Sequence, residues 1–72
     1  MIAEIDETNA LSTREHEVLE WISKGKTDPE IGMILGLAEG TVSSHVFHIK
    51  KKFDVHTRAH AVAKGFRCGL LA

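Results

Sequence analysis

Two capping boxes, each followed by a glycine where a helix must stop, constrain the fold of this chain more than any other feature. Ser12-Thr13-Arg14-Glu15 and Thr27-Asp28-Pro29-Glu30 both have the spacing in which a hydroxyl accepts from a backbone N–H and a glutamate carboxylate accepts from the N-cap amide. Gly25 and Gly36 follow the two boxes and suit the left-handed conformation that ends a helix. These signals predict two short consecutive helices.

A longer third helix is predicted by a stripe of apolar residues at helical spacing. The helix starts near Glu39, and its N-cap position holds Ala38, which has no side-chain oxygen to accept from the first amides. Asp54 stands at its end, where a glycine would fit more easily. The stripe, which we expect to be buried, consists of Val42, Val46, Ile49 and Phe53.

A fourth helix begins at Thr57, with the apolar side chains of Ala61, Val62 and Phe66 directed inward. Gly65 lies inside it, at a cost of about 1 kcal/mol relative to alanine, and is either accidental or permits close approach of another backbone. No segment shows the alternation typical of a strand. We therefore predict an all-α fold, a four-helix bundle with a central helix-turn-helix, whose helices cover roughly residues 12–24, 27–35, 39–53 and 57–67.

The length of the chain allows one small domain and leaves no room for an enzyme cleft with a second lobe. Its 72 residues contain one cysteine, which excludes an internal disulfide and fits a reducing cytoplasm. No apolar run approaches the roughly 18 residues of a membrane span. We expect residues 1–10, which are polar and acidic, to form a flexible tail or a linker stub, and residues 11–72 to form a cytoplasmic domain.

Charge is unevenly distributed along the chain, although the net charge is only -1. Residues 1–20 hold six acidic side chains against one arginine, a balance of -5, while residues 40–72 hold six basic side chains against one aspartate, a balance of +5. Three of the basic residues, Lys50, Lys51 and Lys52, close the third predicted helix. The basic half of the chain is therefore the half that suits a phosphate backbone.

The second and third predicted helices together suit the insertion of one helix into the major groove of DNA. The short turn between them, Thr41-Val42 near the start of the longer helix and the lysines at its end favour that interpretation over a helical hairpin that only packs a core. The lysine run has a structural alternative, because cations at a helix C-terminus oppose the helix dipole without binding a ligand. We take Lys51 as the first candidate for a phosphate contact.

The histidines and the cysteine give no indication of a metal site or an enzyme. His56 and His60 have the spacing of a helical metal-binding pair, but no third ligand accompanies them and His56 precedes the helix. Cys68 has no histidine and acid arranged around it as a nucleophile requires. We therefore expect no catalysis, no metal and no cofactor.

A set of residues distributed over positions 11–71 is in register with a known family of domains. The set consists of Leu11 to Glu15, Glu17 to Leu19, Gly25 to Thr27, Glu30-Ile31, Ile34-Leu35, Thr41-Val42, His45, Ile49, Lys51 to Phe53, Val55, Arg58 and Ala61-Val62. On these residues the chain resembles the LuxR/GerE-type helix-turn-helix domain. Trp21 and the segment Gly25-Lys26-Thr27 are most similar to the autoinducer-responsive, quorum-sensing branch of that family.

The resemblance implies a transcription regulator that binds double-stranded DNA as a homodimer in the bacterial cytoplasm or nucleoid, with RNA polymerase as a further partner. Its third helix would enter the major groove and its fourth helix would form the dimer contact. The base-facing positions correspond to Ser43, Ser44 and Phe47. The phosphate contacts correspond to Lys26, Thr27, Thr41, His45, Lys50, Lys51 and Lys52. For the dimer contact we expect Val62, Gly65, Phe66 and Gly69, in which the two glycines are small residues four apart.

Two base-facing positions depart from the family pattern. The position of Ser43 is frequently lysine or arginine, which make the commonest specific contact to guanine, and the position of Phe47 is often polar or basic. Phe47 could contact a thymine methyl group or a partner protein instead. The alternative function is therefore an interaction module of the same fold that pairs with a related regulator and antagonises it.

Overall fold

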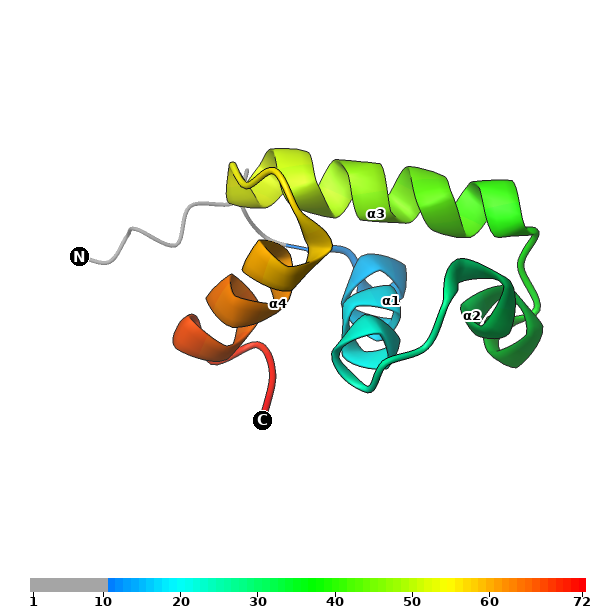
Figure 1. The fold of residues 1–72 in the computed structure, drawn as a ribbon, viewed down its shortest axis with the longest axis horizontal. Coiled ribbons are helices and arrows are strands. Elements are labelled where there is room, and N and C mark those ends of the chain that lie inside the picture. The colour runs from blue at the N-terminus through cyan, green and yellow to red at the C-terminus, as the bar shows by residue number, and fades with distance from the viewer. Residues whose placement is uncertain (1–10) are drawn as a thin grey trace.

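The helices begin and end at the residues that the sequence marks for them, in a computed structural model that describes residues 11–72 (Figure 1). They are α1 (Thr13–Ser23), α2 (Asp28–Leu35), α3 (Glu39–Phe53) and α4 (Arg58–Arg67). No strand occurs among the described residues, so the all-α prediction is confirmed. The predicted tail, residues 1–10, lies outside the described residues. No helix in the described part of the chain is both long and apolar enough to cross a membrane.

Both predicted capping boxes are present. The hydroxyl of Ser12 accepts from the Glu15 N–H at 3.1 Å, and the Glu15 carboxylate accepts from the Ser12 N–H at 2.9 Å. At the start of α2, the Thr27 hydroxyl accepts from the Glu30 N–H at 3.3 Å, and Glu30 accepts from the Thr27 N–H at 2.8 Å. Each box therefore gives partners to two amides that the first turn of a helix leaves unpaired.

The ends of α3 are less well formed than the starts of α1 and α2. Its N-cap residue, Ala38, makes no side-chain hydrogen bond to the helix. Its C-cap residue, Asp54, has a φ of 58°, in the left-handed region that favours glycine. Both features agree with the sequence, since neither residue suits its position.

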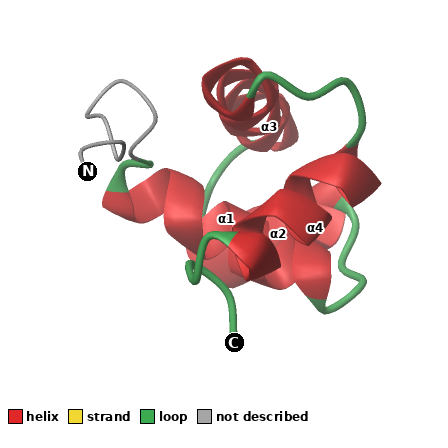
Figure 2. Ribbon diagram, turned by 90° about the vertical axis from the view of Figure 1, so that its left-hand side faces the viewer, coloured by secondary structure: helices red, strands yellow, loops and turns green. Residues whose placement is uncertain are grey.

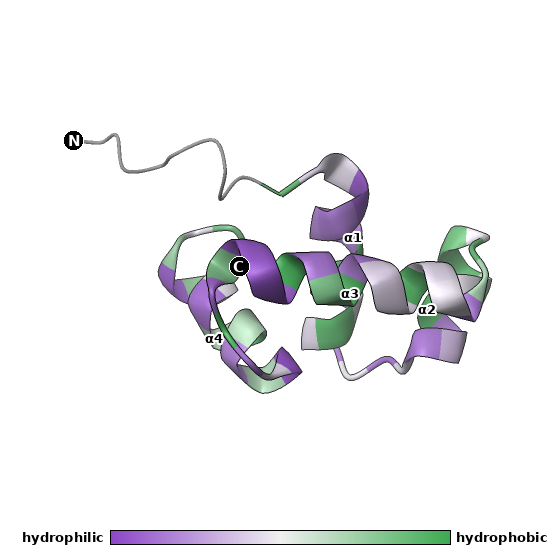
Figure 3. Ribbon diagram, turned by 90° about the horizontal axis from the view of Figure 1, so that it is seen from above, coloured by the Kyte–Doolittle hydropathy of each residue, from purple (hydrophilic) through white to green (hydrophobic). Residues whose placement is uncertain are grey.

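The longest helix, α3, packs against each of the other three (Figures 1 and 2). In Figure 1 it runs along the top of the molecule, with α1, α2 and α4 below it. Seen from above, α3 lies nearest the viewer and leaves one long side uncovered (Figure 3). The fold therefore buries one face of α3 and presents the opposite face to solvent.

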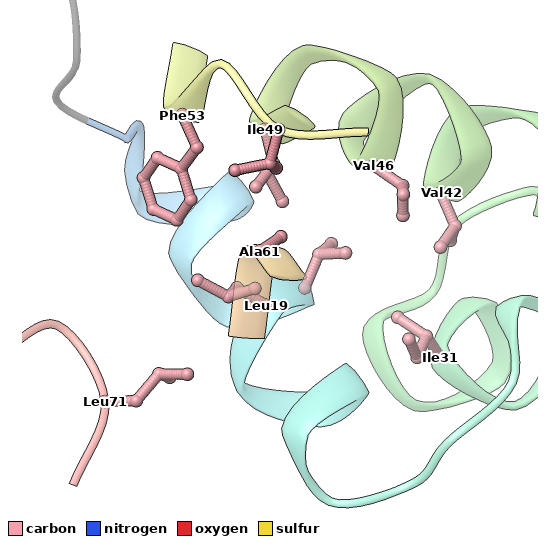
Figure 4. Close-up of a cluster of buried hydrophobic side chains, with 10 residues drawn as sticks. Leu19, Ile31, Val42, Val46, Ile49, Phe53, Ala61 and Leu71 are labelled. Carbon is pink, nitrogen blue, oxygen red and sulfur yellow. The ribbon is translucent and has the colours of Figure 1, made fainter. Parts of the chain in front are cut away.

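The buried face of α3 is the predicted apolar stripe, and all four of its residues are less than 5% exposed: Val42, Val46, Ile49 and Phe53. Figure 4 shows Ile31 of α2 below the Val42 end of the stripe, and Leu19 of α1 and Ala61 of α4 below its middle. Helical spacing predicted this face because side chains three and four positions apart lie on the same side of a helix.

The turn between α2 and α3 passes directly over Gly32, a position that carries no signal in the sequence. The Leu37 N–H donates to the Gly32 carbonyl at 2.8 Å. A β-carbon at residue 32 would lie 2.5 Å from the Leu37 carbonyl oxygen, closer than real β-carbons approach a backbone atom. Gly32 therefore allows the tight connection that brings the start of α3 against α2.

One prediction about α4 is wrong. Phe66 was expected to point inward, but 48% of it is exposed. The buried row of α4 contains Ala61 and Gly65 instead, and a β-carbon at residue 65 would lie 2.9 Å from Leu71 and 3.1 Å from Leu19. Leu71 folds back over Gly65, and Phe66, one position later, is turned about 100° from this buried row and lies on the outer side of the helix.

Candidate nucleic-acid interface

The exposed face of α3 carries a row formed by Ser44, Phe47 and Lys51. An α-helix turns by about 100° per residue, so residues at this spacing follow one another along the side opposite the buried stripe. Phe47 is 56% exposed despite its size. In Figure 3 the first half of this face is pale, whereas the end that carries the lysines is strongly hydrophilic. The row therefore combines a neutral, weakly polar surface with a cationic end.

The three terminal lysines differ in where they lie relative to this row. Lys51 is exposed, and its ammonium lies 5.6 Å from the centroid of the Phe47 ring, in the range of a cation–π contact. Lys50 is half-buried and lies at one edge of the face. Both side chains have the charge needed for a phosphate group, and Lys51 presents it on the row that also carries Phe47.

Lys52 has a different environment. Its ammonium lies 2.8 Å from a carboxylate oxygen of Glu15, which is only 6% exposed. Burial opposes ionisation of Glu15, but hydrogen bonds from Lys52 and Ser12 outweigh that effect and lower its pKa. Lys52 therefore forms an ion pair that ties the end of α3 to the start of α1, and its phosphate contact stays a prediction.

The remaining predicted phosphate contacts lie near the N-termini of the two helices of the helix-turn-helix and along one flank of α3. Lys26 and Thr27 are exposed directly before α2, and Thr41 is exposed in the first turn of α3. His45 is half-buried, on the same flank of α3 as Lys52 because seven residues make nearly two full turns. Helix N-termini present amides and a positive partial charge, which suits anions.

Ser43 takes part in a cluster that sequence reasoning missed. Its hydroxyl donates to Asp28 at 2.8 Å, and Arg58 donates to both oxygens of the same carboxylate. The Arg58 hydrogen bonds are the largest cause that lowers the pKa of Asp28; burial opposes them, and the Ser43 bond adds to them. The three residues come from three helices, so no local pattern could have indicated the cluster.

A shallow, open hollow of about 340 Å³ lies at the C-terminal end of α3. It is lined by Phe47, Lys50, Lys51, Asp54, Val55 and His56. Its lining mixes an apolar ring with charges of both signs.

Across residues 11–72, no three metal-ligating side chains lie together as a metal site would require.

The predicted dimer residues divide into two groups. Phe66 and Gly69 are exposed, and Val62 is partly buried at the edge of the core. Gly65 is covered by Leu19 and Leu71 of the same chain, so the packing within one chain accounts for this glycine. Of the predicted dimer residues, Val62, Phe66 and Gly69 therefore keep exposed surface, and the dimer contact stays a prediction.

Comparisons with known proteins all point to one family of bacterial regulators. A family model described as bacterial regulatory proteins, luxR family, matches residues 9–64. The transcriptional activator protein AhyR of Aeromonas hydrophila is 43% identical over 70 residues, which cover 97% of this chain and 27% of that protein. The quorum-sensing regulator RhlR of Pseudomonas aeruginosa is 43% identical over 61 residues, which cover 85% of this chain and 25% of that protein. The chain thus spans about a quarter of the length of the relatives it matches.

Proposed function

The chain belongs to the luxR family of bacterial regulatory proteins, and we propose that it is the DNA-binding part of a quorum-sensing transcription regulator. Family membership, carried by the match to residues 9–64, makes this a helix-turn-helix DNA-binding domain. The relatives named as activators or quorum-sensing regulators support the wider role. Because only about a quarter of each relative is matched, the activity of the whole regulator belongs to the proposal.

We propose that α3 enters the major groove with the row of Ser44, Phe47 and Lys51 facing the DNA. The observation that carries this proposal is the division of α3 into two faces: the apolar stripe is buried in the domain, while the residues of the opposite row are exposed. A helix that reads the major groove must pack against its own domain by one face and leave the opposite face open to the bases. Lys51 would bind a phosphate group, and Phe47 would contact a thymine methyl group.

A dimer on a two-fold symmetric site is the second part of the proposal. Phe66 is a large apolar side chain, 48% exposed, on a helix that packs against the rest of the domain by its other side. Pairing of two α4 helices through Val62, Phe66 and Gly69 would cover it. The site of action would be the bacterial cytoplasm, and RNA polymerase would be the further partner that a regulator on DNA contacts.

The phosphate role can be tested by replacing two neighbouring lysines. Lys51→Ala should weaken binding to all duplexes alike and reduce the slope of log K against log salt by about one, because one phosphate contact is lost. Lys52→Ala is the matched control: its ammonium is held by Glu15, so the salt slope should stay the same while the domain loses stability. Fluorescence anisotropy with a labelled duplex at several salt concentrations measures both slopes.

Failure of this proposal would be visible in the parent chain. The absence of binding to random duplex at low salt would overturn DNA binding, and equal slopes for the two lysine variants would overturn the role of Lys51. Sedimentation of the complex should show two chains on each symmetric site.

The antagonist alternative has no support, since the matched relatives are named as activators and regulators.

A further inference from the structure

A serine hydroxyl ordinarily has little base preference, because it has one proton and two lone pairs and rotates to suit its partner. At Ser43 that rotation is restricted. Its Oγ donates to Oδ2 of Asp28 at 2.8 Å, from α3 to the first residue of α2. An ionised carboxylate can only accept, so the Ser43 proton lies between these two oxygens.

Arg58 keeps Asp28 in place and ionised. Its two terminal nitrogens donate to the two oxygens of the carboxylate, the second pair at 2.9 Å, and the Asp28 side chain is only 11% exposed. Such a bidentate pair fixes the carboxylate plane as well as its position. The lowered pKa of Asp28, caused first by Arg58, means that the group stays an acceptor at neutral pH.

The position of Ser43 makes this restriction relevant to DNA. Ser43 is exposed on α3 and directly precedes Ser44, the first residue of the row that we propose faces the DNA. With its proton committed to Asp28, its oxygen offers only lone pairs to a group outside the domain. In the major groove, the exocyclic amino groups of adenine and cytosine donate, whereas guanine O6 and N7 and thymine O4 accept. An oxygen that offers only lone pairs attracts the first set and repels the second.

We propose that Ser43 selects adenine or cytosine at one position of the half-site, and that Asp28 and Arg58 are positioning residues that set this preference. The inference rests on the proposed function, since it requires α3 to lie in the major groove. It explains how a serine can select a base at a position where a lysine or arginine would instead select guanine.

The test is selection of duplexes from a random pool by the 72-residue chain, followed by affinity measurements on duplexes that differ at one position. The parent should prefer adenine or cytosine by about fivefold at that position, the worth of roughly one hydrogen bond. Ser43→Ala should remove the preference, and it should fold because the side chain is exposed. Ser23→Ala, the control, replaces a serine at the end of α1, outside the surface proposed to face the DNA, and should keep it.

Asp28→Asn tests the positioning role. Arg58 should retain the amide oxygen, so the amide nitrogen would face Ser43 and donate to it. The serine proton would then be free for a base, and the preference should shift toward guanine or thymine. Circular dichroism establishes that this variant is folded before its affinities are compared.

The outcomes separate the inference from the function on which it rests. Absence of DNA binding by the parent overturns the proposed function and the inference together. Binding in which Ser43→Ala keeps every base preference of the parent overturns the inference alone. A folded Asp28→Asn protein that still prefers adenine or cytosine overturns the role of Asp28.

Discussion

At the scale of single residues, Gly32 decides how closely the turn of the helix-turn-helix passes over α2. The carbonyl oxygen of Leu37 occupies the space in which any larger residue would place its β-carbon. That oxygen belongs to the backbone, so it cannot move aside as a flexible side chain could. The relative placement of α2 and α3, on which a groove-binding surface depends, therefore requires the absence of one side chain.

Replacement of Gly32 by alanine should destabilise the domain. The added methyl group would overlap with the Leu37 carbonyl, and overpacking of this kind costs about 1–3 kcal/mol in the free energy of unfolding. Gly40→Ala is the matched control, because nothing lies within 4 Å of its β-carbon position and α3 is helical there. It should stabilise by about 0.5–1 kcal/mol. Urea denaturation measures both, and equal effects would contradict this account of the turn.

The three consecutive lysines at the end of α3 point in different directions, so neighbours in the sequence have different surroundings in the fold. Successive residues differ in direction by about 100°, so a run of three covers most of the helix circumference. Lys51 faces solvent beside Phe47, whereas Lys52 is bound to Glu15. A charge run on a helix is therefore a set of separate side chains with separate roles.

At the scale of the element, α3 is stabilised by its neighbours more than by its own ends. Its N-cap, Ala38, accepts no amide through a side chain, and Asp54 takes a left-handed conformation that is costly for residues with a β-carbon. One compensation comes from α4, where the Lys64 ammonium donates to the Phe53 carbonyl at 2.8 Å. The buried stripe supplies the rest, as tertiary packing does for most helices in proteins.

The start of α3 has no side-chain cap, so a capping residue at position 38 should stabilise the domain. Ala38→Ser should raise the free energy of unfolding by about 1 kcal/mol, because its hydroxyl would accept from an amide of the first turn. The backbone of residue 38 already has the extended conformation of an N-cap, and the side chain is exposed. Thr27→Ala makes the reverse change in α2 and should lose a similar amount. Thermal and urea unfolding compare the three chains; a serine variant no more stable than its parent would contradict the expectation.

At the scale of the whole molecule, two ion pairs join helices that are distant in sequence. Lys52 and Glu15 connect α3 to α1, and Arg58 and Asp28 connect α4 to α2. Both carboxylates are nearly buried and have pKa values below their ordinary range. The unfolded chain therefore binds protons more readily than the folded chain where these groups titrate.

This difference predicts a loss of stability in acid. Because the folded pKa values of Glu15 and Asp28 are lowered, their contribution is complete above the unfolded pKa values and disappears as the pH falls through the folded ones. The free energy of unfolding should therefore decrease between about pH 5 and pH 3. A Glu15→Gln and Asp28→Asn double variant should be less stable at pH 7 and should lose less on acidification. Urea midpoints at several pH values measure this, and an undiminished decline in the double variant would refute it.

Patterns within the sequence are sufficient to predict where the helices begin and end, which face of α3 is buried, and the family to which the chain belongs. Capping and periodicity act between residues within about four positions, so they can be read locally. The contacts between residues of different helices depend on how whole helices pack, so they are found in the folded chain alone. The partner of Lys52, the cluster around Asp28, the need for Gly32 and the outward position of Phe66 all arise at that level.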